Sequence, residues 1–386
     1  MTLALAAAAF AQDLGVPLSW REFTNNRSHA ELISISEAAI DTILPQLNVA
    51  SGDFAGIGYW QAGNVWSAMA NEDFRAGTTK YKAQVVDQLN NVFGLWAHYD
   101  QFGFNDDAMW WATAAYYGFR AYGDTNLLSH AEDVWTHVNT FVIPAGASSI
   151  STKNFGFSAT CEGKSMAGGV FWRTDAGDDN VNSVTTGLFI TLSAYLAEVT
   201  GDAKYTNAAI ASANWIRRLN LNSDPIVLDT VHALDCSRTP TTWLFTYNTG
   251  KYLEGLEVLY DVTKDTQWRD LAVSIGNAGM KSTAWAGSNG VCTEGASPDS
   301  NNDGVGFKAI WVRAIDEAYN RVAKRGDNEA YRILLHSYVD VQLNALLELA
   351  ANGTSYSSAW AGPPQGFTTW GQLASLDVFV AALHAA

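Results

Sequence analysis

The sequence has few charged residues, and basic residues are the scarcer kind. Only 16% of the 386 residues are charged, and 23 Lys and Arg against 39 Asp and Glu give a net charge of −16. Nucleic acids and anionic membrane surfaces bind proteins through clustered basic residues, so neither kind of partner is expected. Polyanionic substrates are disfavoured for the same reason. A neutral partner is the simplest remaining case.

Cysteine and histidine are also scarce, and neither shows the spacing of a metal site. The three cysteines, Cys161, Cys236 and Cys292, permit one disulfide and one free thiol, and the seven histidines have no ligand spacing. The apolar run at residues 1–11 is too short to cross a bilayer. It resembles the remnant of a secretory signal peptide, which predicts a secreted protein.

Hydrophobic and aromatic residues, by contrast, are plentiful. They make up 48% and 12% of the chain, and there are 15 tryptophans. A chain of this composition buries a core, so disorder over most of its length is excluded. The flat faces of Trp suit the C–H faces of sugar rings, although Trp is also an ordinary core residue.

A short turn recurs along the chain, at residues 121–125, 199–203, 262–266 and 324–328. In each copy an apolar helical pattern precedes the turn, an Asp can cap the next helix, and three copies carry a Gly before that Asp. The Asp residues are 62 to 78 residues apart. A period of this size indicates one helical hairpin per unit.

Twelve segments have apolar residues at helical spacing. Twelve helices in six hairpins predict an all-α fold, a closed (α/α)6 toroid that forms one domain over residues 12–386. The predicted helices are 32–49, 58–70, 78–97, 105–121, 125–141, 180–199, 202–219, 241–262, 266–283, 305–324, 327–351 and 369–383.

The lengths of the connections predict where the functional site lies. The long ones, 142–179, 220–240, 284–304 and 352–368, each precede an even-numbered helix, whereas the connections that follow even-numbered helices are short. In a toroid of alternating inner and outer helices, all long loops therefore collect on one face. Functional residues tend to lie on long loops held by a rigid scaffold. We expect the site at the N-termini of the even-numbered helices, taken as the inner ring.

Asp106 and Asp107 begin the fourth helix, and this pair has two interpretations. Acidic residues in a first helical turn commonly compensate the helix dipole. Glycoside hydrolysis, however, needs one ionised and one protonated carboxyl group. A helix N-terminus keeps one carboxyl ionised, while burial and like-charge repulsion raise the pKa of the other above about 3.9. The apolar residues that follow, Met109-Trp110-Trp111, favour a water-excluding site and hence the second interpretation.

Eight further residues are candidates for sugar binding, because they stand at the same helix starts or in the long loop before the sixth helix. Structural alternatives remain for them: core packing for the aromatic rings, helix capping for the acid, and a buried stem with a solvated head for the lysine. The candidates are Trp60, Asn105, Trp172, Asp179, Asn182, Tyr247, Asn248 and Lys308.

Several of these residues fall in segments that follow the order of a known family. Residues 104–111 (FNDDAMWW) resemble the Asp-Asp motif of glycoside hydrolase family 76, the endo-α-1,6-mannanases. Residues 168–172 resemble its Gly-Gly-x-x-Trp segment, and residues 247–250 its Tyr-Asn-x-Gly motif. Phe307-Lys308 with Arg313 resembles its Phe-Lys-Gly…Arg motif, with Ala309 in place of the Gly.

This resemblance implies an (α/α)6 barrel that hydrolyses α-1,6-mannan with retention of configuration. Asp106 would be the nucleophile and Asp107 the general acid/base, and such chemistry needs no metal and no cofactor. Fungal members of the family include cell-wall transglycosylases, so transglycosylation remains open, as does a non-catalytic glycan-binding protein on the same scaffold. We expect a secreted monomer whose partner is α-mannan or a manno-oligosaccharide, with no nucleic acid partner and no membrane span.

Overall fold

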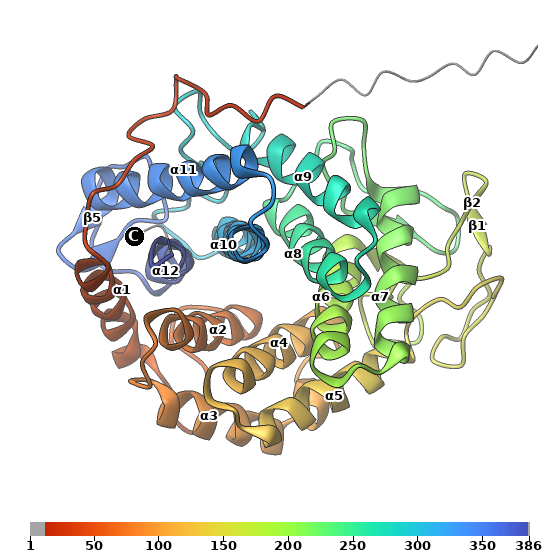
Figure 1. Cartoon of the computed structure of the whole chain (residues 1–386). Helices are drawn as coiled ribbons and strands as arrows, with labels where there is room; N and C mark the ends of the chain where they lie inside the picture. The colour runs from red at the N-terminus through yellow and green to blue at the C-terminus, as the bar shows by residue number, and fades with distance from the viewer. Residues whose placement is uncertain (1–11, 385–386) are drawn as a thin grey trace, which may run out of the picture.

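Twelve α-helices close into a ring in the computed structural model, which describes residues 12–384 (Figure 1). The segment predicted as a signal remnant, residues 1–11, lies outside the described residues. The helices are α1 His29–Ile43, α2 Tyr59–Ala76, α3 Lys82–Leu95, α4 Asn105–Tyr122, α5 Thr125–Asn139, α6 Ser183–Thr200, α7 Ala203–Trp215, α8 Thr246–Thr263, α9 Thr266–Met280, α10 Phe307–Arg325, α11 Glu329–Ala345 and α12 Thr369–Ala382.

The even-numbered helices form the inner ring, which confirms the predicted (α/α)6 architecture. Helix α2 contacts α4, and the contacts continue through α6, α8, α10 and α12 back to α2. The odd-numbered helices lie outside this ring (Figure 1). An inner helix is covered on nearly all sides, so its sequence has little polar face. In α6, every residue from Ser183 to Ala197 is buried.

Short turns join the inner helices to the outer helices that follow them. Four inner helices end at a glycine in the left-handed conformation, which satisfies the last helical carbonyls without a Cβ clash: Gly77, Gly123, Gly201 and Gly326. Lys264 takes the same conformation after α8, with φ 58°. The next outer helices begin at the predicted capping residues Asp124, Asp202 and Asp265. The fourth turn differs, because Asn328, and not Asp327, caps α11. The side chain of Asn328 accepts a hydrogen bond from the backbone N–H of Tyr331.

Several helix limits differ from the predicted ones, and the second helix continues to Ala76 instead of ending at residue 70. The first helix ends at Ile43 instead of residue 49, because Pro45 lacks an N–H and stands in a 3-10 turn, Leu44–Gln46. The sixth begins three residues late, at Ser183, because Asn180–Asn182 form strand β3. The eighth begins at Thr246 instead of residue 241.

Extended segments cross the face where the inner helices begin. Strand β3, Asn180–Asn182, pairs in antiparallel register with β4, Thr230–His232, and single bridges join Val181 to Phe171 and Phe104 to Arg173. The loop before α6 is thereby fixed to the start of α4 on one side and to the loop before α8 on the other. Two further two-stranded pairs lie in the loops, β1 Thr160–Cys161 with β2 Lys164–Ser165 and β5 Ala351–Asn352 with β6 Ser355–Tyr356.

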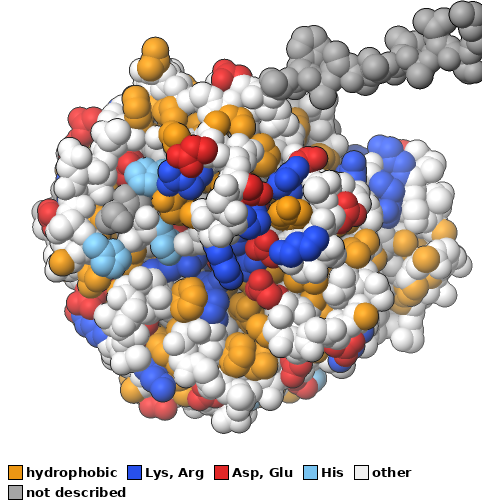
Figure 2. All heavy atoms as spheres, viewed as in Figure 1, with side chains coloured by type: hydrophobic (Ala, Val, Ile, Leu, Met, Phe, Trp, Pro, Cys, Tyr) orange, Lys and Arg blue, Asp and Glu red, His pale blue; other side chains and the backbone are white. Residues whose placement is uncertain are grey.

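The opposite end of the ring is closed by ion pairs. Figure 2 shows basic and acidic side chains gathered at the centre of this face. Glu317 of α10 accepts hydrogen bonds from Arg75 of α2, Arg120 of α4 and Arg321 of α10. Arg321 also reaches Asp261 of α8 at 2.7 Å. These pairs tie the C-terminal ends of four inner helices together, so the ring is open to a ligand only at its other end.

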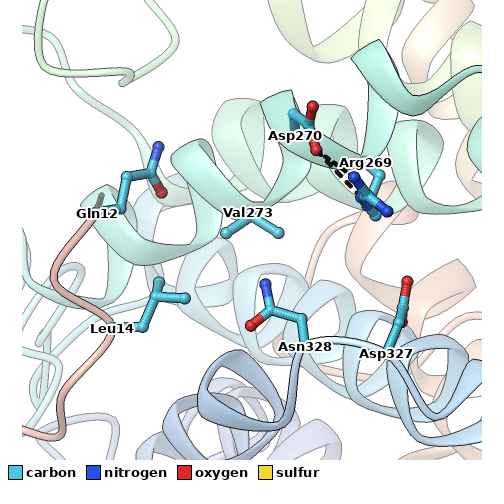
Figure 3. A pocket seen from close by; sticks show the side chains of 7 residues that line it. All are labelled: Gln12, Leu14, Arg269, Asp270, Val273, Asp327 and Asn328. Atoms are coloured by element: carbon cyan, nitrogen blue, oxygen red, sulfur yellow. Dashed lines mark hydrogen bonds and ion pairs between the residues drawn. The ribbon is translucent and has the colours of Figure 1, made fainter. Parts of the chain in front are cut away.

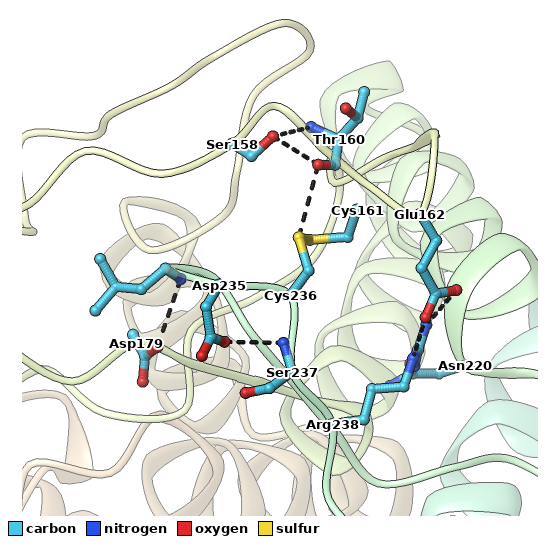
Figure 4. Close-up of a disulfide and its surroundings, with 11 residues drawn as sticks. Ser158, Thr160, Cys161, Glu162, Asp179, Asn220, Asp235, Cys236, Ser237 and Arg238 are labelled. Carbon is cyan, nitrogen blue, oxygen red and sulfur yellow. Dashed lines mark hydrogen bonds and ion pairs between the residues drawn. A yellow bond between two sulfur atoms is a disulfide. The ribbon is translucent and has the colours of Figure 1, made fainter.

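A disulfide joins two of the loops on the open face. Cys161 pairs with Cys236, whereas Cys292 is buried as a free thiol. Arg238 supports the same connection through an ion pair with Glu162 and a hydrogen bond to Asn220 (Figure 4). Across residues 12–384, the model contains no helix that is both long and apolar enough to span a membrane.

Candidate active site

A cleft of about 670 Å³ opens at the N-terminal ends of the inner helices, on the face predicted from the loop lengths. Aromatic rings and carboxylates dominate its walls, and five of the six inner helices contribute residues at or next to their starts. The lining residues are Gly58, Tyr59, Trp60, Phe102, Phe104, Asp106, Asp107, Trp110, Trp172, Asn180, Asn182, Asp229, Thr230, Thr239, Trp243, Phe245, Tyr247, Asp303, Gly304 and Phe307.

Asp106 and Asp107 lie in the first turn of α4, and both line this cleft. The start of the helix is held by the loop before α6: the backbone N–H of Asn105 donates to Trp172 O at 2.8 Å, and its side-chain Nδ2 donates to Phe171 O at 2.8 Å. Asn105 is therefore fully buried and does not reach the cleft. Its contacts join the segment that carries the Asp pair to the loop that carries Trp172.

Two glycines bring Trp172 to this position. Gly168 has φ +90°, and a Cβ there would lie 2.2 Å from Ala211 O of α7. A Cβ on Gly169 would lie 2.6 Å from the indole nitrogen of Trp215. Only residues without a side chain allow this loop to pack directly on α7.

Burial changes the ionisation of both carboxyl groups. It raises the pKa of Asp106 to about 7, although hydrogen bonds from the Trp172 side chain and from backbone N–H groups oppose the rise. Burial together with the charge of Asp106 raises the pKa of Asp107 well above its usual value, and Asp303 and Asp100 add to this effect. The charge of one carboxyl group therefore opposes ionisation of the other, so the two groups titrate as a pair. One oxygen of Asp106, Oδ1, is buried without a hydrogen-bond partner.

An aromatic wall runs along the other side of the cleft. The ring of Trp60 lies 5.7 Å from that of Trp110 and 5.8 Å from that of Phe307. Phe307 in turn stacks on Tyr247 at 3.8 Å, and Phe245 lies 5.4 Å from Phe307. Rings that contact one another in this way are fixed by packing and leave a rigid apolar surface. Trp60, Trp172 and Tyr247, three predicted sugar-binding residues, all stand on the cleft.

Asp229 is a cleft residue that the sequence does not reveal. Its carboxylate accepts hydrogen bonds from Asn248 Nδ2 and Thr230 Oγ1, both at 3.1 Å, and burial raises its pKa. Asn248 thus acts on the cleft indirectly, by orienting Asp229. The predicted residue Asn182 lines the cleft and also caps α6 through Thr185 N.

Two predicted binding residues lie away from the cleft. Asp179 accepts hydrogen bonds from His232 Nδ1 at 3.1 Å and from Leu234 N at 3.4 Å, and so holds the loop that carries Cys236 (Figure 4). Lys308 is completely buried, and burial lowers its pKa to about 8. Its ammonium donates to the carbonyls of Glu294 and Ser358, which belong to two different long loops.

Asp303 enters the cleft from the loop before α10. It begins a 3-10 turn, Asp303–Gly306, after an acidic and amide-rich stretch that is visible in the sequence. The loop is tightly folded, because a Cβ on Gly295 would lie 2.0 Å from Gly304 O. No group of three or more His, Cys, Asp or Glu side chains within residues 12–384 is arranged to hold a metal ion.

A second depression, of about 460 Å³, lies outside the ring between the N-terminal segment, α9 and the turn before α11 (Figure 3). Its charged groups are already paired: Arg269 binds Asp270, and Asp327 binds Arg325. No aromatic ring lines this depression. The aromatic cleft is therefore the candidate active site.

Comparison with known proteins supports the fold and identifies the family. The fold is similar to that of an inactive variant of the alpha-1,6-mannanase from Salegentibacter sp., solved with alpha-1,6-mannotriose, with a TM-score of 0.77, 16% identity and coverage of 92% of this chain and 100% of that one. It is also similar to Dfg5 from Chaetomium thermophilum, solved with glucosamine, with a TM-score of 0.72, 17% identity and coverage of 94% and 92%.

Sequence relatives and a family model give the same result. The mannan endo-1,6-alpha-mannosidase of Saccharomyces cerevisiae is 25% identical over 67% of this chain and 57% of its own length. The chain spans only 50% to 57% of the length of the curated relatives that it matches. The model of glycosyl hydrolase family 76 matches residues 149–386, a region that begins after the Asp pair. The chain belongs to glycosyl hydrolase family 76.

Proposed function

We propose that this protein is a retaining endo-α-1,6-mannosidase in which Asp106 is the nucleophile and Asp107 the general acid/base. One observation carries the proposal: two adjacent, partly buried carboxyl groups, both with raised pKa values, line an aromatic cleft. Near neutral pH this arrangement supplies one carboxylate and one carboxylic acid, which is what double displacement requires.

In the first step, the carboxylate of Asp106 attacks the anomeric carbon of the mannosyl unit. The bond from that carbon to the glycosidic oxygen breaks, and Asp107 gives its proton to the departing oxygen. The product is a glycosyl ester on Asp106. In the second step, the Asp107 carboxylate takes a proton from water, the water oxygen attacks the anomeric carbon, and the Asp106 carboxylate is released with the configuration retained.

Named relatives support the substrate. The Salegentibacter mannanase is described as inactive when two adjacent aspartates are replaced by asparagine, and that variant was solved with alpha-1,6-mannotriose. The S. cerevisiae relative is named a mannan endo-1,6-alpha-mannosidase. A neutral mannan chain also suits a protein with a net charge of −16. We also propose that the protein is secreted and acts as a monomer.

The cleft residues divide into two roles in this mechanism. Trp60, Trp172 and Tyr247 stack on sugar rings, and Asn182 and Asp229 bind hydroxyl groups. Four predicted residues act as positioning residues, each through a hydrogen bond to another residue: Asn105, Asp179, Asn248 and Lys308.

Transglycosylation is the second candidate, and the lining of the cleft favours it. Aromatic walls that exclude water also provide surfaces for an acceptor sugar, whose hydroxyl would replace water in the second step. The similarity to Dfg5 bound to glucosamine supports an acceptor of this kind.

Proton NMR of linear α-1,6-mannan incubated with the purified protein tests the proposal. A first product with an α-anomeric signal, lost in the Asp106→Asn variant, is the expected result. An initial β-anomer would overturn the nucleophile assignment. New linkages that grow with added acceptor sugar would favour transglycosylation. Binding of the mannan without any turnover would indicate a glycan-binding protein.

A further inference from the structure

Two aromatic rings on the rim of the cleft are unusually exposed. Phe102 is 54% exposed and Trp243 is 48% exposed, which makes them the two most exposed aromatic side chains of residues 12–384. Both line the cleft. Exposed apolar surface beside a groove often marks the place where a ligand continues beyond it.

Each ring is fixed from behind. Phe102 meets Tyr59 edge-on at 5.6 Å, and the Tyr59 hydroxyl donates to Tyr99 O at 2.9 Å. Tyr59 also stacks on the buried ring of Trp111 at 4.9 Å. On the other side, the ring of Trp243 lies 6.1 Å from that of Phe245, which joins the aromatic wall through Phe307. A ring supported in this way can stack on a ligand with little further loss of conformational freedom.

The two rings pack on opposite sides of the inner ring of helices. Phe102 precedes α4 and packs on the first residue of α2, whereas Trp243 precedes α8. In a closed ring of six inner helices, α8 is opposite α2. The Asp pair belongs to α4, the neighbour of α2 in this ring, and it lines the same cleft as both rings.

We propose that Phe102 and Trp243 are sugar-binding platforms on the rim of the cleft, each stacking on one pyranose ring beyond the sugars held beside Asp106 and Asp107. The inference rests on the proposed mannan-cleaving function and specifies its substrate: an internal stretch of a long, unbranched chain that spans both platforms. Short oligosaccharides occupy the central cleft and leave one or both platforms empty.

Chain-length dependence of kcat/KM tests the proposal, with α-1,6-linked mannotriose and a longer linear mannan as substrates. Phe102→Ala and Trp243→Ala should each reduce the ratio of kcat/KM on the long substrate to that on the trisaccharide by about three- to tenfold, the range of one aromatic stacking contact. The loss should appear chiefly in KM. The double variant should lose about the product of the two factors, because the sites are far apart.

Two exposed aromatic residues outside the cleft serve as matched controls. Trp96 is 37% exposed and Phe74 is 39% exposed, and neither lines the cleft. Trp96→Ala and Phe74→Ala should leave the ratio unchanged. If Phe102→Ala and Trp243→Ala behave like these controls, the platforms are refuted while the proposed function stands. If the wild type cleaves neither substrate, the proposed function itself fails.

Discussion

The side chain of Trp172 lowers the pKa of the Asp106 carboxyl group, against the effect of burial. This interaction connects the loop before α6 to the first turn of α4, and it favours the charged form of the acid that we propose as the nucleophile. We therefore propose two roles for Trp172, one as an apolar face for the sugar and one as a donor to Asp106. The two roles can be separated by substitution.

Trp172→Phe should move the acid limb of the pH–activity profile to higher pH. Phenylalanine retains an aromatic face but has no N–H, so the pKa of Asp106, already raised to about 7, should rise further. Loss of a hydrogen bond to a charged group should shift the pKa by about one unit or somewhat more. The measurement is kcat/KM as a function of pH, which reports the free enzyme. An acid limb at the wild-type position would show that the indole N–H has no influence on Asp106.

Replacing the second acid should stabilise the fold while it abolishes turnover. The pKa of Asp107 is raised by burial, so its neutral form is favoured in the folded state, and the stability associated with it is lost as the pH rises from about 4 through the folded pKa. Asparagine cannot ionise. Asp107→Asn should therefore have a Tm about 2–4 °C above the wild type at pH 8, and no advantage at pH 4.

Asp202→Asn is the matched control for this change. Asp202 is an exposed N-cap, and asparagine caps a helix about equally well, so Tm should change little at either pH. A lower Tm for Asp107→Asn at pH 8 would contradict the proposed burial penalty.

The ring could be predicted from the sequence because its signals are local. Helical periodicity, the repeated turns and the lengths of the loops each depend on residues that are near one another in the chain. The place of Asp106 and Asp107 in the first turn of a helix could be predicted for the same reason. Asp229 could not be found, because its place depends on the pairing of β4 with β3 and on a hydrogen bond from Asn248 of the next helix.

Asp179 and Lys308 show the opposite case: each stands close in sequence to a cleft residue, yet neither side chain lines the cleft. Asp179 stands three residues before the cleft residue Asn182, yet strand pairing turns its carboxylate toward His232. Lys308 follows the cleft residue Phe307, yet the helix directs its ammonium to the carbonyls of Glu294 and Ser358 in two of the long loops. Neighbouring positions in a helix or strand face different directions, and only packing decides which of them faces a cleft.

Gly168→Ala should disturb both stability and activity. A Cβ at this position would meet the backbone of α7 at 2.2 Å, so the loop that carries Trp172 would have to move. We expect destabilisation by about 3 kcal/mol or more, as for other severe backbone clashes, and a clear loss of kcat/KM. Gly146 in the same loop has φ +72° with open space around it. Gly146→Ala should show only the small backbone cost of about 1 kcal/mol. Equal losses in the two variants would rule out the contact with α7 as the cause.

The ion pairs that close the far end of the ring should make Glu317 important for stability. Glu317 is buried, and burial alone would raise its pKa, but Arg120, Arg321 and Arg75 together hold that pKa well below its usual range. A depressed carboxyl pKa stabilises the fold above the unfolded value of about 4.3, and this contribution is lost as the pH falls toward the folded pKa.

Glu317→Gln keeps the shape of the side chain but leaves three buried arginines without their shared partner. We expect a loss of about 3–5 kcal/mol at pH 7, measured by urea unfolding, and a smaller difference from the wild type below pH 4. Glu329→Gln is the control, because Glu329 forms an exposed pair with Arg332 that contributes little. Equal stability of Glu317→Gln and Glu329→Gln at pH 7 would contradict this prediction. The arginines would then be paired sufficiently by the remaining acids, Asp316, Glu198 and Asp261, and the far end of the ring would not depend on Glu317.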